Sequence, residues 1–154
     1  MILRDALLHF VHFLCIFALA SLLVGEALLL RKSLSRDAVA LLATIDRWYG
    51  IAAGLVVVSG VSLVFFGLKG ATYYVHSPVF WTKMALFACV AIVSIVPTVA
   101  FLRWRRRQGM NGSLVLDDGE YTRLRALLWA EIGVFVFIPL CAALMANGIS
   151  GRAG

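Results

Sequence analysis

Ionisable side chains inside long apolar stretches are the residues of this chain that could do chemistry. Each needs a specific partner or function, because an Asp, Lys or Arg at the centre of a lipid-embedded helix costs about 2.5 to 3.5 kcal/mol. They fall into two groups along the chain. The first group is His9, His12 and Lys83, and the second is Glu26, Asp46, Arg47 and Glu131.

The first group has the chemistry of a cofactor site. His9 and His12 are three residues apart, so in a helix they lie on adjoining parts of one face. Neutral imidazole can bind haem iron or another metal, or relay protons. Lys83 should lie near the same membrane level, about 6 Å inside its own helix, where it either holds an anionic group or extends to the lipid headgroups. We predict a haem b site of His9, His12 and Lys83; histidines that only hydrogen-bond to neighbouring helices are the alternative.

The second group lies at another depth. Glu26 follows His12 by 14 residues, which is almost four helical turns and about 21 Å, so the two cannot bind one ion. Glu26 therefore belongs with Asp46, Arg47 and Glu131. Glu131 is the deepest acid, and either protonation or an ion pair with Arg47 would relieve the cost of burying it. We predict an ion-pair or proton layer here, with the ion pair favoured.

The elements that position these residues are predicted to be membrane-spanning helices. The chain is 62% hydrophobic and 14% charged, with a mean hydropathy of +0.96, whereas soluble chains are about 45–50% apolar and about 25% charged. Crossing a bilayer takes about 20 apolar residues. We predict one domain, residues 1–154, with an all-α fold of four transmembrane helices. Their ranges are 6–30, 38–68, 79–102 and 123–147.

Charge predicts how the helices are oriented. The connections after the first and third helices carry ten Arg and Lys residues, and the opposite side carries three. Cytoplasmic loops collect such residues, so both connections should be cytoplasmic and both termini non-cytoplasmic. The first helix should be retained rather than cleaved, because its apolar run is longer than that of a signal peptide.

Small residues and prolines predict local features of these helices. Gly50 and Gly54 form a GxxxG pair, which we expect to pack closely within the bundle, with dimerisation as the alternative. Pro97 and Pro139 should kink the third and fourth helices. Residues 108–120 are rich in Gly and Asp and predict a flexible loop.

Several functions find no support in the sequence. The net charge of +6 is explained by membrane orientation, so we expect no nucleic-acid partner. Cys15, Cys89 and Cys141 are isolated within apolar stretches and match no zinc or disulfide pattern. No Walker loop, HExxH motif or dinucleotide-binding turn is present, and the residues alone do not decide whether the protein is an enzyme.

Four segments carry a family resemblance: HFVHFLCIFALASLLVGEALLLR, DRWYGIAAGLVVVSGVSLVFFGLKGATYYVHSPVFWTKMALF, PTVAFLRWRR and LLWAEIGVFVFIPLCAALMANG. They resemble a family of small bacterial inner-membrane proteins of unknown function. The resemblance covers nearly the whole chain and implies the four-helix architecture and a multi-pass inner-membrane location.

A more distant resemblance is to HemJ-type protoporphyrinogen oxidases and to the CopD membrane domain. HemJ-type proteins have a His in the first helix and a Lys that opens a later one, and they are implicated in haem b binding and porphyrin oxidation. By position, His9 or His12 and Lys83 match that pair. This chain differs in having two histidines, and Glu26 where a basic residue is expected.

The leading hypothesis is therefore an inner-membrane protein that binds haem b, or handles a porphyrin or electrons. One alternative is an accessory or scaffold subunit whose polar residues only stabilise the bundle. The other is a proton- or ion-coupled transporter that uses Glu26 and Glu131. Since four helices are few for a transport path, a homodimer stays among the alternatives. The expected partners are the lipid bilayer and a haem or porphyrin.

Overall fold

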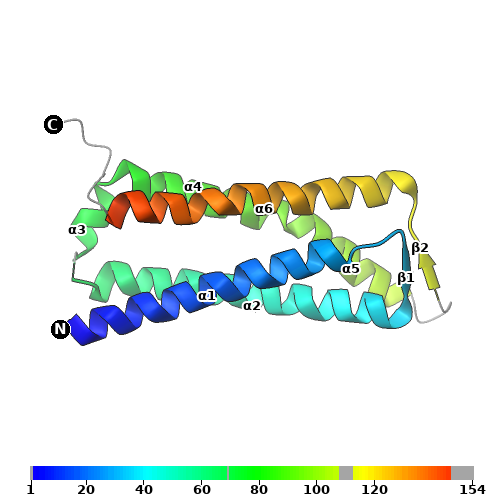
Figure 1. Ribbon diagram of the computed structural model, residues 1–154, viewed down its shortest axis with the longest axis horizontal. Helices are drawn as coiled ribbons and strands as arrows, with labels where there is room; N and C mark the ends of the chain where they lie inside the picture. The colour runs from blue at the N-terminus through cyan, green and yellow to red at the C-terminus, as the bar shows by residue number, and fades with distance from the viewer. Residues whose placement is uncertain (1, 69, 108–112, 147–154) are drawn as a thin grey trace.

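The computed structural model describes residues 2–68, 70–107 and 113–146 of the chain (Figure 1). Four helical spans in it are long and apolar enough to cross a membrane, which confirms the predicted all-α fold. The spans are α1 (Ile2–Leu29), α2 (Arg36–Phe66), α4 (Pro78–Val93) continued by α5 (Ile95–Arg107), and α6 (Asp118–Ala146). The shorter elements are β1 (Ser33–Ser35), α3 (Gly70–Val75) and β2 (Ser113–Val115).

The spans associate as two antiparallel pairs. α1 packs mainly against α2, and α6 packs mainly against α4, while contacts of α2 with α5 and of α1 with α6 close the bundle. α1 begins and α6 ends at the end that carries α3, and the two strands lie at the opposite end (Figure 1). We call these the α3 end and the strand end.

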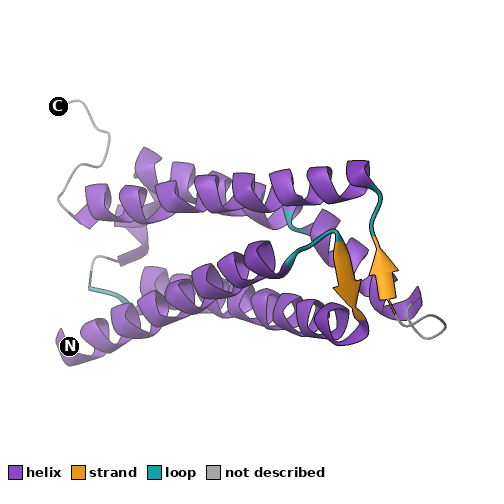
Figure 2. Ribbon diagram, turned by 45° about the vertical axis from the view of Figure 1, so that its right-hand side comes forward, coloured by secondary structure: helices purple, strands orange, loops and turns teal. Residues whose placement is uncertain are grey.

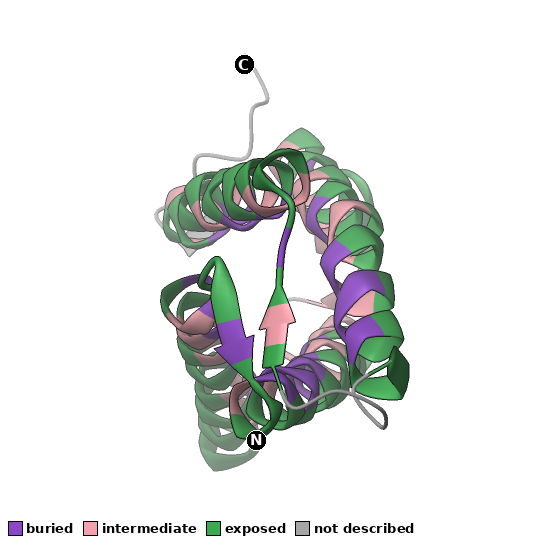
Figure 3. Ribbon diagram, turned by 90° about the vertical axis from the view of Figure 1, so that its right-hand side faces the viewer, coloured by how far each residue is buried: buried purple, intermediate pink, exposed green. Residues whose placement is uncertain are grey.

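Apolar side chains cover the outside of the bundle as well as its core. Seen along the bundle in Figure 3, the exposed faces of the helices turn outward. Large apolar residues such as Phe17, Val58 and Phe137 are more than half exposed. A protein in water rarely exposes so much apolar surface, whereas in a membrane the lipid acyl chains cover this surface at no cost. The exposure therefore fits a chain that spans a membrane.

Local sequence signals explain where the helices begin and end. The Ser35 hydroxyl accepts a hydrogen bond from the Ala38 backbone N–H at 3.2 Å and so caps the start of α2. Ser77 caps α4 in the same way, and Pro78 occupies its first turn. α2 ends where the Gly67 N–H donates to the Leu63 carbonyl at 2.9 Å.

The third span is two helices rather than one. α4 ends at Val93 and α5 begins at Ile95, with Ser94 between them, three residues before Pro97. Pro97 has no N–H to donate to the preceding turn, which explains the break. α6, in contrast, continues without interruption through Pro139.

The prediction of a flexible loop over residues 108–120 was wrong in part. Residues 113–115 form β2, which pairs antiparallel with β1, and α6 already begins at Asp118 (Figure 2). In both strands the central residue is a Leu between exposed neighbours, and Leu34 opposite Leu114 is 1% exposed. Burial of this leucine against the bundle fixes the pairing. Residues 108–112 lie outside the described residues.

An ion pair supports the same connection at the strand end. The Lys32 ammonium bonds to the Asp118 carboxylate, which raises the pKa of Lys32 by stabilising its charged form. Both side chains are mostly exposed, so the pair contributes little to the free energy of unfolding. Burial of Leu34, together with the backbone pairing of the strands, outweighs this pair in holding the connection in place.

The expected packing of Gly50 and Gly54 inside the bundle was wrong. A Cβ atom added at either residue would meet nothing within 4 Å, and both glycines are exposed. The neighbouring Ala52 is buried instead, at 6% exposure. The GxxxG pattern places two glycines on one face of α2. It does not determine whether that face turns toward the bundle, because small residues also lie on the neighbouring faces.

Candidate functional site

A cavity of about 300 Å³ lies near the α3 end, between the α1–α2 pair and the α4–α6 pair. His9, His12 and Lys83 all line it. Most other lining residues are aliphatic or aromatic, among them Phe13, Ile16, Tyr74, Phe80, Phe87 and Phe135. The structure thus brings the three residues of the first predicted group to one apolar cavity.

His12 has one ring nitrogen in use and one without a partner. The residue is 6% exposed, and its Nδ1 lies 2.8 Å from the Ser59 hydroxyl oxygen. The Ser59 hydroxyl also lies within hydrogen-bond distance of the Leu55 carbonyl at 2.7 Å and of the Val56 carbonyl at 3.1 Å, so it can donate its proton to α2 and accept from His12. In the tautomer that carries the proton on Nδ1, neutral His12 donates to Ser59 and keeps a lone pair on Nε2. This Nε2 is buried and has no hydrogen-bond partner among the described residues.

A glycine lets the His12 ring lie close to α2. A Cβ atom at Gly60 would lie 3.2 Å from Cε1 of His12, closer than ordinary van der Waals contact. Gly60 follows Ser59 directly, so consecutive residues of α2 hold one ring nitrogen and make room for the ring. Both contacts orient the imidazole within the cavity.

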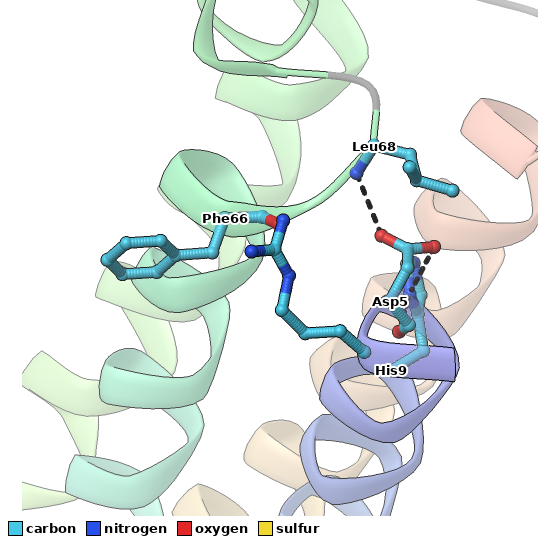
Figure 4. A network of polar contacts seen from close by, with 5 residues as sticks. Asp5, His9, Phe66 and Leu68 are labelled. Atoms are coloured by element: carbon cyan, nitrogen blue, oxygen red, sulfur yellow. Dashed lines mark hydrogen bonds and ion pairs between the residues drawn. The ribbon is translucent and has the colours of Figure 1, made fainter. Parts of the chain in front are cut away.

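His9 is held differently. Its Nδ1 donates to the Asp5 backbone carbonyl at 2.9 Å and lies 3.4 Å from an Asp5 carboxylate oxygen. The other Asp5 oxygen accepts from the Leu68 N–H at 2.9 Å, and Arg4 donates to the Phe66 carbonyl at 2.9 Å (Figure 4). These bonds tie the start of α1 to the end of α2. The His9 side chain is 43% exposed, so it is the outer of the two histidines.

Lys83 supplies positive charge to the same cavity. Its side chain is half-buried, and both Lys83 and His9 are close enough to His12 to act on it electrostatically. Within the described part of the chain, the Lys83 ammonium has no hydrogen bond or ion pair. A carboxylate that enters the cavity would therefore meet an unpaired cation.

The second predicted group is brought together in the half of the bundle nearer the strand end, except for one member. Glu26, Asp46 and Glu131 are 1%, 6% and 2% exposed, and their charges act on one another. Asp46 accepts a hydrogen bond from the Thr98 hydroxyl at 2.6 Å. Oε1 of Glu26 and both carboxyl oxygens of Glu131 have no hydrogen-bond partner among the residues that the structure describes.

The expected ion pair between Arg47 and Glu131 was wrong. Arg47 is exposed, whereas both oxygens of Glu131 are buried and unpartnered. Arg47 follows Asp46 directly, and adjacent helical residues point about 100° apart, so only one of the two can face the core. Asp46 takes that position.

Comparison with known proteins places the chain in a family. A family model described as "Predicted membrane protein (DUF2214)" matches residues 4–150. The chain belongs to this family. The DUF2214 match includes both groups of polar residues and agrees with the multi-pass membrane architecture. No curated protein and no solved structure matches the chain, so the relation to HemJ-type and CopD proteins stays a prediction.

Three polar residues of the DUF2214 chain complete these sites but were not among the predicted site residues. Ser59 holds His12, Thr98 holds Asp46, and Tyr49 lies among the three carboxyl groups. Tyr49 is 5% exposed. A search for every hydroxyl within the apolar spans would have found all three, since each sits in a predicted helix.

Proposed function

We propose that this DUF2214 protein binds haem b or a related porphyrin in the cavity at the α3 end, with Nε2 of His12 as the ligand to iron. The observation that carries the proposal is this nitrogen: it is buried and has no partner among the described residues, and it belongs to a histidine that lines an apolar cavity. The proposed location is the bacterial inner membrane, with both termini on the non-cytoplasmic side, as the distribution of Arg and Lys predicts.

The state of His12 suits a metal ligand. A buried polar atom without a partner costs about 1 to 3 kcal/mol, which a bond to iron would offset. Iron binds neutral imidazole, and ligating histidines usually donate their other N–H to an oxygen that fixes the tautomer. Ser59 occupies that position at 2.8 Å. The residues present therefore fit an iron ligand.

The surroundings favour haem over a bare metal ion. Among the described residues, no group of three or more His, Cys, Asp or Glu side chains is arranged to hold a metal. A metal bound by His12 must then bring further ligands with it, as haem iron brings its porphyrin nitrogens. When bound, haem would supply electron transfer or redox chemistry.

The charge of Lys83 and the size of the cavity both bear on how haem would be bound. The unpaired ammonium of Lys83 is suited to a propionate carboxylate. The volume of about 300 Å³ is at the low end for small-molecule sites. Haem b is larger than this, so the cavity as it stands would hold only part of the group.

His9 has a supporting role in this proposal. His9 and His12 are three residues apart on one helix, so they cannot approach one iron from opposite sides. His12 is the more buried and the better oriented of the two. His9 would instead line the outer part of the site, where Asp5 holds it.

Absorption spectroscopy tests the proposal. The protein purified in detergent from haem-replete cells should be coloured, with a Soret band that His12→Ala removes and that Lys83→Ala weakens. A colourless wild-type protein would refute haem binding. If both variants changed only thermal stability, the alternative of an accessory or scaffold subunit would be favoured.

The buried carboxyl groups support a second candidate, a proton- or cation-coupled transporter. Glu26, Asp46 and Glu131 lie together in the core, and no basic side chain of the described chain pairs with them. Ionisable groups buried at membrane depth often serve a transport path. Uptake of protons by vesicles that contain the protein should then be lost in the Glu26→Gln/Glu131→Gln double variant. Uptake that survives both changes would rule this candidate out.

A further inference from the structure

A second cavity, of about 580 Å³, lies at the strand end between α5 and α6. It arises from the break at Ser94: α4 packs closely along α6, but α5 turns toward α2 and leaves α6 (Figure 1). The two helices therefore diverge toward the strand end. Neither group of polar residues considered above lines this cavity, so it is independent of the proposed function.

The inner part of this cavity is apolar and open to the outside of the bundle. Ile95, Val96 and Val99 on α5 are 57%, 37% and 46% exposed, although they line the cavity. Ala100 and Leu124 form its buried floor, at 7% and 2% exposure. These apolar walls belong to a helix long and apolar enough to span a membrane, and they are open to the outside of the bundle, so lipid acyl chains can fill the groove that they form.

The outer part carries two arginines. Arg103 follows Val99 by one helical turn on α5, and Arg123 faces the same cavity from the start of α6. Both are exposed, and neither guanidinium has a hydrogen bond or ion pair in the part of the chain that the structure describes. Two unpaired guanidinium groups thus stand above an apolar groove.

Two acidic residues also line this rim, and both already have partners. The Asp117 carboxylate accepts a hydrogen bond from the Gly119 N–H at 3.0 Å. The Glu120 carboxylate accepts one from the indole N–H of Trp104 at 3.2 Å. Each bond comes from a neutral donor, so it orients its acid without neutralising it. Within the described residues neither acid forms an ion pair with Arg103 or Arg123, so both arginines can bind an added anion.

We propose that the groove between α5 and α6 binds an anionic phospholipid. One acyl chain would lie on Ile95, Val96 and Val99, and the phosphate would be bound by Arg103 and Arg123. Guanidinium groups bind phosphate with paired hydrogen bonds, and basic pockets between membrane helices are known to select acidic headgroups. The groove joins both features at one membrane level.

A phospholipid fits the groove better than the other occupants. Free phosphate would leave the apolar wall uncovered, and an apolar helix of a second copy would leave two guanidinium groups buried without partners. The strand end also carries most of the Arg and Lys residues of the chain, which concentrates anionic lipid near this groove.

Lipid retention by the full-length protein tests the proposal. The detergent-purified chain is exchanged with phosphatidylglycerol or phosphatidylcholine, and bound lipid is counted by native mass spectrometry. We expect phosphatidylglycerol to be retained preferentially, Arg103→Gln and Arg123→Gln to weaken retention about five-fold each, and the double variant about 25-fold. Arg107→Gln is the matched control, because this exposed arginine of α5 does not line the cavity.

A variant that keeps both charges separates a specific groove from a general basic surface. Val96→Trp should fill the groove and reduce retention of phosphatidylglycerol as strongly as the loss of one arginine. Equal retention of the two lipids, equal effects of Arg103→Gln and Arg107→Gln, displacement of the lipid by inorganic phosphate alone, or a dimer that buries the groove whichever lipid is present would each overturn the proposal.

Discussion

At the scale of single residues, the proposed site depends on how one imidazole is oriented. In the tautomer with the proton on Nδ1, His12 donates to Ser59, Ser59 donates to a backbone carbonyl of α2, and Nε2 keeps its lone pair. The histidine spacing and the level of Lys83 were sufficient to predict that these residues belong together. The tautomer could not be predicted, because it depends on Ser59, 47 residues away in sequence.

Removal of the Ser59 hydroxyl should weaken the site without removing the ligand. In Ser59→Ala, Nδ1 loses its acceptor, and the orientation of the ring is no longer fixed. Loss of such an outer partner typically lowers metal affinity 10- to 100-fold. We expect haem titration of the purified variant to give an affinity lower by about that factor. Ser62→Ala, at a half-buried serine whose hydroxyl donates to the Val58 carbonyl of the same helix, should leave it unchanged.

Gly60 offers a second test at this scale. A methyl group at this position would press on the His12 ring at 3.2 Å, so Gly60→Ala should shift the Soret band or lower haem affinity. Gly133→Ala is the control, since its new methyl group meets nothing within 4 Å. Both changes raise helix propensity alike, which isolates the steric effect. Identical spectra for the two variants would show that Gly60 does not position the ring.

At the scale of elements, local sequence patterns predicted the helical spans, and packing between distant segments determined the features that these patterns did not predict. Apolar length predicted all four spans, and Pro97 predicted a disturbance in the third. The β1–β2 pairing was missed because its strands are short and far apart in sequence, and each contributes a single Leu to the apolar pattern. The exposed position of Gly50 and Gly54 was missed because small residues occur on both faces of α2.

The carboxyl layer gives a prediction about stability. Both oxygens of Glu131 are buried without partners, so Glu131→Leu should leave thermal stability in detergent unchanged or raise it, by about 1 to 3 kcal/mol. Asp46→Leu is the contrasting variant and should destabilise, because the Thr98 hydroxyl then loses its acceptor. Strong destabilisation by Glu131→Leu would mean that this carboxyl group has a structural partner.

At the scale of the whole molecule, the two sites lie at opposite ends of one bundle. The break in the third span separates two packing arrangements. At the α3 end α4 packs along α6 beside the His12 cavity, and at the strand end α5 diverges from α6 and the arginine-lined groove lies between them. The structure fixes that α1 begins and α6 ends at the same end of the bundle (Figure 1). Which side of the membrane this is rests on charge alone, and a homodimer remains a prediction.

Orientation can be measured with reporter fusions. Reporters that are active only outside the cytoplasm should be active at both the N- and the C-terminus, and inactive when inserted at residues 108–112. The reason is the excess of Arg and Lys in the connections at the strand end. Reporters on opposite sides would contradict the four-span topology itself, and both termini in the cytoplasm would reverse the orientation.

Haem titration of the cofactor-free protein and its histidine variants tests the central claim most directly. The wild-type chain should bind one haem per chain with a defined Soret band. His12→Ala should abolish this binding, and His9→Ala, in the same helix and cavity, should retain it. Absence of stoichiometric binding by the wild-type chain, or unchanged binding by His12→Ala, would contradict the account.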